Sequence, residues 1–460
     1  MTHAHFINKD KQALERALKT ITIIIEVNIV NWISRFSKQS VAIALSTFIT
    51  STAWAETIVI TADRLVDVTN GNVIKNAAVV VDDNIITAAG AVASISLPTD
   101  AARIDLGDST LMPGLMDMHV HLTSDATRHG YKRLEVSLPR AAITGVKHAK
   151  ATLEAGFTTV RNVGAPGFAD VALRDAINAG DVEGPRMFVA GPSLGVTGGH
   201  CDSNLLPYEY DNYSEGVADG PWEVRKTVRR NIKYGATVIK FCATGGVLSK
   251  GTKVGAQQYT FEEMKALIDE AHLRGLTVAT HAHGTSGIKD AIKAGVDSVE
   301  HVSLLDDEAI ALAKENGTYF SMDIYVTEYI LGEGEKAGIL EESLNKERIV
   351  GKTQRENFKK AVNAGVNMVF GSDAGVYPHG DNPKQFARMV KFGMTPMQAI
   401  QAATINPARL LKQEATLGSL DKGKFADIVA VPGNPMEDMS LMENVGFVMK
   451  DGSIVKQYAM

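Results

Sequence analysis

The chain has 460 residues, of which 45% are hydrophobic and 22% are charged, so it is long enough for one large domain and a smaller one. This composition is typical of a soluble globular enzyme rather than of a disordered or membrane-embedded chain. The 47 basic and 53 acidic residues give a formal net charge of −6, and no basic stripe is interleaved with aromatic side chains. We therefore expect no nucleic-acid partner.

The N-terminal segment differs from the rest of the chain. No charge occurs from Ser40 to Ala55, and the stretch ends in Ala53-Trp54-Ala55, a small-x-small cleavage pattern. This pattern predicts a bacterial export signal, with residues 1–55 as signal peptide and upstream extension, and hence a periplasmic or secreted protein. The apolar part is shorter than the ~20 residues of a membrane span, so we expect membrane contact only if the signal is uncleaved.

The chain contains two cysteines, Cys201 and Cys242, which are too few for a disulfide scaffold. The favoured interpretation is that both are unpaired and pack as small hydrophobic side chains. Export would bring them into an oxidising compartment, where a disulfide can persist. A single bridge between them therefore stays open as the alternative.

Strand-like segments lie on both sides of a long middle region. Between residues 56 and 112, "TIVITADRLVDV" and "AAVVVDDNIITAAG" cluster β-branched residues around a turn at Asp82-Asp83-Asn84. Between residues 415 and 460, "ADIVAVPGNP" and "VGFVMKDGSIVKQ" repeat this pattern, with a turn at Asp451-Gly452. We predict that residues 56–112 and 415–460 together form one small β domain.

The middle region, residues 113–414, repeats a unit in which a helical stretch stops at a glycine and a short apolar strand follows. Six glycines occupy the expected left-handed position after a helix, namely Gly156, Gly235, Gly275, Gly295, Gly317 and Gly365. With "PGLMDMHVH" and "GPRMFVAG", the predicted strands number eight. This alternation predicts an α/β fold, a (β/α)8 TIM barrel, although eight units alone are also compatible with an open sheet.

Metal-capable side chains gather at the ends of these strands. His119 and His121 stand two residues apart in the first strand, so both should point the same way at the C-terminal mouth of a barrel. The later strands end in further ionisable residues, namely Lys240, His281, His283, His301 and Asp373. Imidazole and carboxylate ligands without cysteine suit zinc or another divalent transition metal in a catalytic site.

The strings "MPGLMDMHVHL", "IKFCATGGVLS", "HAHG", "SVEHVSLLDDE" and "GSDAG" resemble the amidohydrolase superfamily. Together they are similar to its imidazolonepropionase-related branch, which includes metal-dependent Xaa-Pro dipeptidases (prolidases). The resemblance implies a barrel accompanied by a small β-sandwich built from both chain ends. It also implies two divalent metal ions, with His119, His121 and Asp373 holding one, and His281 and His301 holding the other.

The resemblance further implies that Lys240 bridges the two ions, which would be zinc by default. A lysine can bridge metals only as a carbamate, formed when its neutral amine takes up CO2, and neighbouring cations favour that neutral form. The alternative is an ordinary salt bridge inside the barrel between Lys240 and an acid such as Asp373.

Three residues are candidates for catalysis. Asp373 would take a proton from an activated water and pass it to the departing amide nitrogen. His283 lies two residues beyond His281, and His200 follows the third predicted strand. We expect His283 to contact the substrate or the transition state rather than to be a third ligand. His200 could donate to the substrate carbonyl, with an ordinary loop histidine as the alternative. The candidates for binding substrate are Tyr259, Tyr325 and His379, with packing as the alternative role.

The preferred interpretation is a hydrolase of dipeptides, most readily Xaa-Pro, with Xaa-hydrophobic or Xaa-Arg/Lys as alternatives. A hydrolase of a cyclic amide, such as imidazolonepropionase, would use the same chemistry, but an export signal argues against it. A metal-free binding protein would lack ligands, whereas all six positions are filled here. The substrate would then be a small peptide, and helices around a barrel would also permit a homo-oligomer.

Overall fold

The structure is a computed structural model and describes residues 57–457. The predicted signal peptide and upstream extension, residues 1–55, lie outside the described residues. Within the described range, no helix is both long enough and apolar enough to cross a membrane.

Strands from both ends of the described chain form one eight-stranded sheet, in the order β16-β15-β14-β5-β1-β2-β3, with β4 paired to β1. These strands are β1 (Thr57–Asp67), β2 (Asn72–Asp82), β3 (Ile85–Ala91), β4 (Ala102–Asp105), β5 (Ser109–Pro113), β14 (Ile428–Pro432), β15 (Phe447–Lys450) and β16 (Ser453–Gln457). The two ends meet where β5 and β14 pair antiparallel, with Leu111 opposite Ala430. Both predicted hairpin turns are present, and the division into a sandwich and a barrel domain stays a prediction.

All eight strands that were predicted in the middle region are present, in two parallel sheets. The first sheet contains β6 (Leu115–Val120), β7 (Phe157–Asn162) and β8 (Arg186–Val189). The second contains β9 (Ile239–Cys242), β10 (Val278–Ala282), β11 (Ser298–His301), β12 (Tyr319–Ser321) and β13 (Met368–Val369). This confirms an α/β fold with parallel sheets, but these strands do not form one closed sheet.

Two isolated parallel bridges nevertheless join the two sheets at both edges. Leu194, which follows β8, bridges to Phe241 of β9, and Val120 of β6 bridges to Ala374, which follows β13. The backbone N–H of Met118 also donates to the carbonyl of Phe370 over 2.8 Å. The C-terminal ends of the two sheets are therefore held close to each other.

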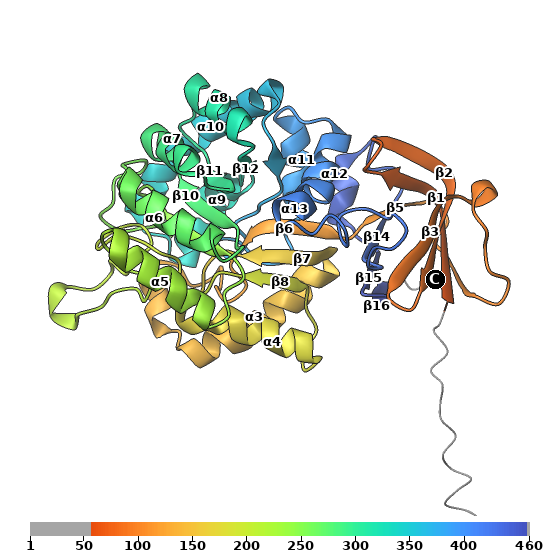
Figure 1. Ribbon diagram of the computed structural model, residues 1–460, viewed down its shortest axis with the longest axis horizontal. Helices are drawn as coiled ribbons and strands as arrows, with labels where there is room; N and C mark the ends of the chain where they lie inside the picture. Colours follow the sequence, from red (N-terminus) through yellow and green to blue (C-terminus); the bar gives the residue numbers. More distant parts are fainter. Residues whose placement is uncertain (1–56, 458–460) are drawn as a thin grey trace, which may run out of the picture. The chain divides into compact units, whose positions relative to one another are not determined.

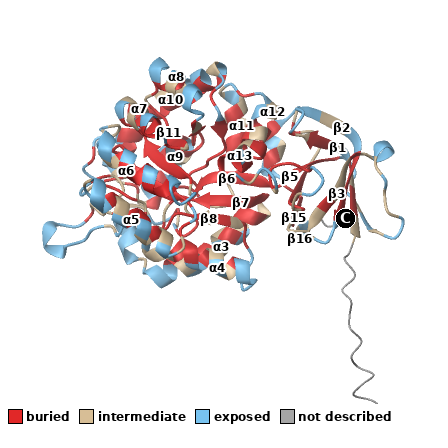
Figure 2. Cartoon of the chain, in the orientation of Figure 1, coloured by how far each residue is buried: buried red, intermediate tan, exposed pale blue. Residues whose placement is uncertain are grey.

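Helices lie around the parallel strands, with their buried faces toward the strands and their exposed faces outward (Figures 1 and 2). They are α3 (Leu138–Glu154), α4 (Ala169–Ala179), α5 (Pro221–Lys233), α6 (Phe261–His272), α7 (Thr285–Ala294), α8 (Asp307–Asn316), α9 (Val326–Ala337), α10 (Glu341–Ala364), α11 (Lys384–Lys391), α12 (Pro396–Ala402) and α13 (Ile405–Leu410). Short 3-10 turns are η1 (Val92–Ser94), η2 (Gly130–Glu135), η3 (Pro166–Phe168), η4 (Tyr208–Tyr210) and η5 (Met439–Glu443).

The six glycines predicted to be left-handed all have φ between +70° and +101°. At such angles a side chain would meet its own backbone, so glycine ends each helix at low cost and lets the chain enter the next strand. Because each of these glycines marks the end of a helix and the start of the next strand, the order of the strands could be predicted from the sequence.

The largest core packs the parallel strands against the surrounding helices. Three aromatic rings lie at one contact within it: the ring of Phe370 lies 5.2 Å from that of Phe157 and 4.7 Å from that of Phe386, between centroids. All three side chains are fully buried. The segment that carries Asp373 is thereby anchored to β7 and α11.

Replacing Phe370 by alanine should remove this anchor and leave a cavity that the fixed strands cannot fill. We expect the free energy of unfolding to fall by about 3–5 kcal/mol, measured by urea denaturation. The control is Ile143→Ala on α3, whose side chain is 64% exposed and whose loss should cost less than about 0.5 kcal/mol. Equal losses in the two variants would contradict this account of the core.

Candidate metal centre

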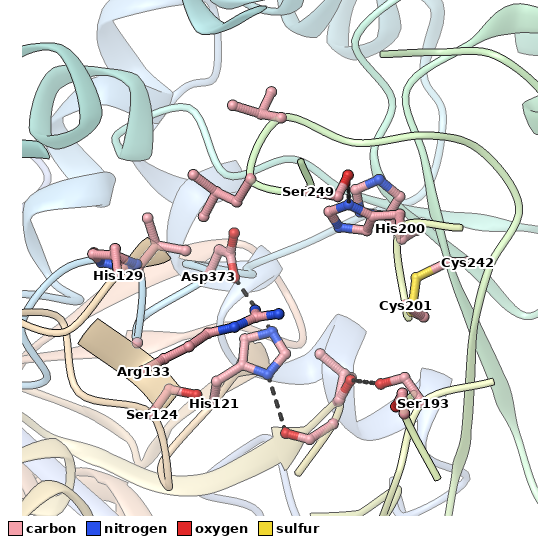
Figure 3. A pocket seen from close by; sticks show the side chains of 18 of the residues that line it. His121, Ser124, His129, Arg133, Ser193, His200, Cys201, Cys242, Ser249 and Asp373 are labelled. Carbon is pink, nitrogen blue, oxygen red and sulfur yellow. Dashed lines mark hydrogen bonds and ion pairs between the residues drawn. A yellow bond between two sulfur atoms is a disulfide. The ribbon is translucent and has the colours of Figure 1, made fainter. Parts of the chain in front are cut away.

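The predicted metal ligands come together at the C-terminal ends of the parallel strands. One cavity of about 680 Å³ is lined by His119, His121, Lys240, His281, His283, His301 and Asp373, and by the loop residue His200. Figure 3 shows the side chains of His121, His200 and Asp373 pointing into it. Strand topology explains this convergence, because parallel strands end on the same side of their sheet.

The first group of ligands forms around Asp373. Its Oδ1 atom lies 3.4 Å from Nε2 of His119 and 3.4 Å from Nε2 of His121. Ligand atoms of His119, His301 and Asp373 also lie within 4.8 Å of one another. Two imidazoles and a carboxylate can hold one divalent cation in this geometry.

A second group forms at β10 and β11. Ligand atoms of His281, His283 and His301 lie within 4.8 Å of one another, and Nε2 of His281 is buried without a hydrogen-bond partner in the described structure. An unpaired buried nitrogen of this kind costs free energy unless something binds it. The sequence assigned His283 to the substrate, whereas its placement is equally suited to a ligand.

The side chain of Lys240 lines the same cavity. Its Nζ is buried, and neither a hydrogen bond nor an ion pair to it occurs among the described residues. The alternative of a salt bridge to Asp373 is therefore not observed. Burial lowers the pKa of Lys240 to about 8, which raises the fraction of neutral amine at neutral pH.

Three of the four predicted ligand imidazoles are oriented by a contact to the other ring nitrogen. Nδ1 of His119 donates to Glu300 over 3.1 Å, that of His121 to the carbonyl of Gly164 over 3.2 Å, and that of His301 to Asp323 over 3.0 Å. Because carbonyl and carboxylate oxygens only accept, the proton must be on Nδ1 in all three rings. In the neutral imidazole, Nε2 then has a free lone pair, as a metal ligand requires.

Sequence reasoning missed the buried ion pair behind this arrangement. Nη2 of Arg161 on β7 lies 2.7 Å from Oε1 of Glu300 on β11, and both side chains are fully buried. Burial alone would raise the pKa of Glu300, but Arg161 and His119 overcome that effect and hold it well below its usual range. An arginine inside the apolar strand "FTTVRN" and an acid next to His301 were the available signals.

The backbone is strained at two of the predicted ligands. His301 has φ +71°, the following Val302 has φ +51°, and Asp373 has φ +58°. Residues other than glycine rarely adopt left-handed angles, and each costs on the order of 1–3 kcal/mol. Such strain persists where surrounding contacts fix it, and here it turns both ligands into the cavity.

His200 is held over the second ligand group. Its ring stacks on that of His281 with centroids 3.9 Å apart, and its Nδ1 lies 2.8 Å from the hydroxyl of Ser249. Burial, followed by the nearby His283 and His301, holds the pKa of His200 well below its usual range. The imidazole is therefore neutral at physiological pH.

The two cysteines form a disulfide, which corrects the favoured sequence interpretation. Cys201 and Cys242 are bonded, with Cα atoms 5.9 Å apart. The bond joins the loop after β8, next to His200, to β9, which carries Lys240. Sequence reasoning could not detect this contact because 41 residues separate the two cysteines.

The three predicted substrate residues do not line the cavity. Tyr259 is 1% exposed, and its hydroxyl donates to the carbonyl of Ala218 over 2.9 Å. The ring of Tyr325 meets that of Tyr377 edge-on, and His379 stacks on another imidazole while Nε2 lies 3.2 Å from the His121 carbonyl. Their placement supports packing and positioning roles rather than substrate binding.

A model of the amidohydrolase family matches residues 110–455. The chain belongs to the amidohydrolase family. This amidohydrolase is 34% identical to the ochratoxinase of Aspergillus niger, over 89% of this chain and 88% of that one. A crystal structure of a Xaa-Pro dipeptidase with bound methionine in the active site shares 42% identity at a TM-score of 0.82, covering 87% of this chain and all of the other.

An imidazolonepropionase of Chromobacterium violaceum is more distant, at 24% identity over 72% of this chain and 78% of its own length. These comparisons confirm the resemblance that the sequence motifs indicated. They also establish that the amidohydrolase is a hydrolase acting on amide bonds.

Replacing Arg161 by methionine should leave the Glu300 charge buried without its main partner. We expect the free energy of unfolding at pH 7 to fall by about 3–5 kcal/mol, measured by chemical denaturation. Adding Glu300→Gln to that variant should recover part of the loss, because the uncompensated charge is then gone. If the single variant were as stable as Lys352→Ala, in which an exposed ion pair is lost, this interpretation would be wrong.

Proposed function

We propose that the amidohydrolase is a binuclear metal-dependent dipeptidase that cleaves small peptides, most readily Xaa-Pro. The observation that carries this proposal is the convergence of six ligand-type side chains from separate strand ends in one cavity. The similarity to a Xaa-Pro dipeptidase over 87% of the chain supports the substrate class. That relative holds methionine in its active site, so an apolar residue in the C-terminal position is a second candidate.

We also propose that the two parallel sheets are parts of one (β/α)8 barrel. The bridges at Leu194 and Val120 support this, because they join the sheets at both edges. The eight strands and their helices follow one another in the order that such a barrel requires.

The residues at the site fit two divalent cations. The unpaired Nζ of Lys240 and the unpaired Nε2 of His281 are the decisive observations, because each buried atom otherwise lacks a partner within the described chain. We propose that His119, His121 and Asp373 hold one ion and that His281 and His301 hold the other, with a Lys240 carbamate between them. Zinc is the default for this donor set. When bound, the ions would polarise the scissile carbonyl and acidify a water.

Asp373 is placed to move the proton. Its Oδ1 faces His119 and His121, and no hydrogen bond or ion pair engages Oδ2 within the described residues. Burial raises the pKa of this carboxyl above its usual range, so it can hold a proton at a pH where an exposed aspartate would not. It would take the proton from the attacking water and give it to the leaving nitrogen.

His200 and His283 can stabilise the substrate oxygen as charge develops on it. Both rings are neutral, since burial lowers the pKa of His283 to about 3 and also depresses that of His200. The Ser303 hydroxyl lies 2.8 Å from Nδ1 of His283, in the same way that Ser249 contacts His200. If each serine donates, the ring proton moves to Nε2, which can then donate to an oxyanion.

The direction of the Ser303 contact also separates the two roles of His283. As a metal ligand, His283 would need its proton on Nδ1 and would donate to the serine. As an oxyanion donor, it would accept from the serine instead.

We further propose that the amidohydrolase acts in the periplasm or outside the cell. The uncharged segment before Ala55 carries this proposal, and the Cys201–Cys242 disulfide supports it, because structural disulfides persist in oxidising compartments.

The test of the substrate class is a comparison of Ala-Pro, Ala-Leu, Ala-Arg and a cyclic amide, with released amino acid or ring opening as the readout. We expect the purified, metal-loaded protein to hydrolyse Ala-Pro with the highest kcat/KM. Hydrolysis of Ala-Leu or Ala-Arg without hydrolysis of Ala-Pro would show that the preferred C-terminal residue is not proline. Opening of the cyclic amide with no dipeptide cleavage would refute the dipeptidase proposal.

The test of the lysine is Lys240→Ala. Without the carbamate, we expect bound metal, measured by atomic emission, to fall from two ions per chain to one or none, and kcat to fall at least about 1,000-fold. Added propionate should partly restore the metal content and kcat, because its carboxylate can take the place of the carbamate. The control is Lys250→Ala, a lysine of the same cavity whose Nζ donates to Tyr131. Full metal content in Lys240→Ala would contradict the bridging role.

A further inference from the structure

The mouth of the cavity carries apolar side chains that face solvent. Leu134, Val136 and Leu138, at the end of η2 and the start of α3, all line the cavity. Leu134 is 42% exposed and Leu138 is 46% exposed. Large apolar side chains that stay exposed at the rim of a pocket mark a surface that an apolar group covers on binding.

Arg133 precedes this apolar run and reaches into the same cavity as His121 and Asp373 (Figure 3). The residue is exposed overall, so it lies at the mouth rather than at the bottom. Protein nevertheless surrounds much of its guanidinium, and this burial lowers the pKa of Arg133. The positive charge of Arg133 also contributes to the lowered pKa of the His200 imidazole.

The guanidinium of Arg133 has no acidic partner in the described part of the chain. Two nearby cationic residues do have partners. Nη1 of Arg128 lies 2.8 Å from Oε2 of Glu135, and Nζ of Lys132 donates to the carbonyl of Lys336. A guanidinium is a rigid fork of five donors that matches a carboxylate in two parallel hydrogen bonds. An unpaired one in a substrate cavity therefore indicates an anionic ligand.

Six acids line the cavity, namely Asp125, Asp202, Glu215, Asp323, Glu347 and Asp373, and none of them forms an ion pair with Arg133 among the described residues. The carboxylate of Asp202 accepts from the backbone N–H groups of Gly198 and Ser214. Asp323 accepts a hydrogen bond from His301. Oδ1 of Asp373 faces His119 in β6 and His121 just after that strand. The charge that would complement Arg133 is thus not supplied from within the cavity.

We propose that Arg133 binds the free carboxylate of the substrate and that Leu134, Val136 and Leu138 cover the apolar side chain of the same C-terminal residue. This inference rests on the proposed dipeptidase function and deepens it. It assigns carboxylate recognition to the loop after β6 in place of Tyr259, whose hydroxyl is occupied.

The chemistry of a dipeptide supports this position. The scissile nitrogen and the terminal carboxylate are attached to the same carbon atom, so the carboxylate receptor must lie close to the group that protonates that nitrogen. Asp373 and Arg133 line one cavity. Binding the carboxylate there would hold the leaving nitrogen in place for proton transfer.

The test compares Ala-Leu with Ala-Leu amide, which differ only in the terminal charge. The wild type should prefer the acid by at least about tenfold in kcat/KM. In Arg133→Gln we expect kcat/KM for the acid to fall between about 10- and 100-fold, mainly through KM, with less than a twofold change for the amide. Arg133→Lys should be intermediate, because it keeps the charge but loses the fork.

The matched control is Lys132→Gln, which removes a positive charge from the same 3-10 turn without touching the cavity lining. It should leave the preference for the acid unchanged. Equal losses on acid and amide in Arg133→Gln, or no loss on either, would overturn the inference.

Calorimetric binding of L-leucine and L-leucinamide gives the same comparison without turnover. The wild type should bind leucine more tightly, and Arg133→Gln should remove that preference. If the wild type hydrolysed neither of these peptides nor Ala-Pro, the proposed function would fail by itself. The binding comparison would still decide the role of Arg133, since equal binding of leucine and leucinamide by the wild type would refute it.

Discussion

The site depends on one buried ion pair that crosses the interior between the two parallel sheets. Arg161 on β7 donates to Glu300 and Ser298 on β11 and to the carbonyl of Met118 on β6. Glu300 in turn accepts from His119. Two sheets that share no regular strand pairing are therefore connected through charged groups at the level of the ligands. Because both charges are fully buried, neither sheet can shift relative to the other without exposing an unpaired charge.

Hydrogen bonds from Nδ1, one of them to this ion pair, also orient three of the predicted ligand histidines. The carboxylates of Glu300 and Asp323 and the carbonyl of Gly164 each fix one imidazole proton on Nδ1. The left-handed backbone at His301 and Asp373 then directs the side chains inward. Orientation by hydrogen bonds and orientation by strain act on the same cluster.

Much of this could be predicted from the sequence, and the reasons are local. Glycine after a helix, alternation along a strand and the parallel order of βα units gave the eight strands and placed His119, His121, His281 and His301 at one end. The Arg161–Glu300 pair, the disulfide and the true environment of Tyr259 could not be predicted in this way. Each depends on which side chains meet across 41 or more residues, and no local pattern encodes that distance. Tyr259 precedes a capped helix as expected, but its hydroxyl turns to Ala218 instead of the cavity.

A disulfide bond also crosslinks one side of the cavity wall. Cys201 and Cys242 line it, and the bond between them ties the His200 loop to the strand that carries the central lysine. Where thiols are kept reduced, that loop would be held only by weaker contacts such as the one from His200 to Ser249. The shape of the binding site is therefore linked to the compartment in which the chain folds, and material produced in a reducing cytoplasm would differ there from exported material.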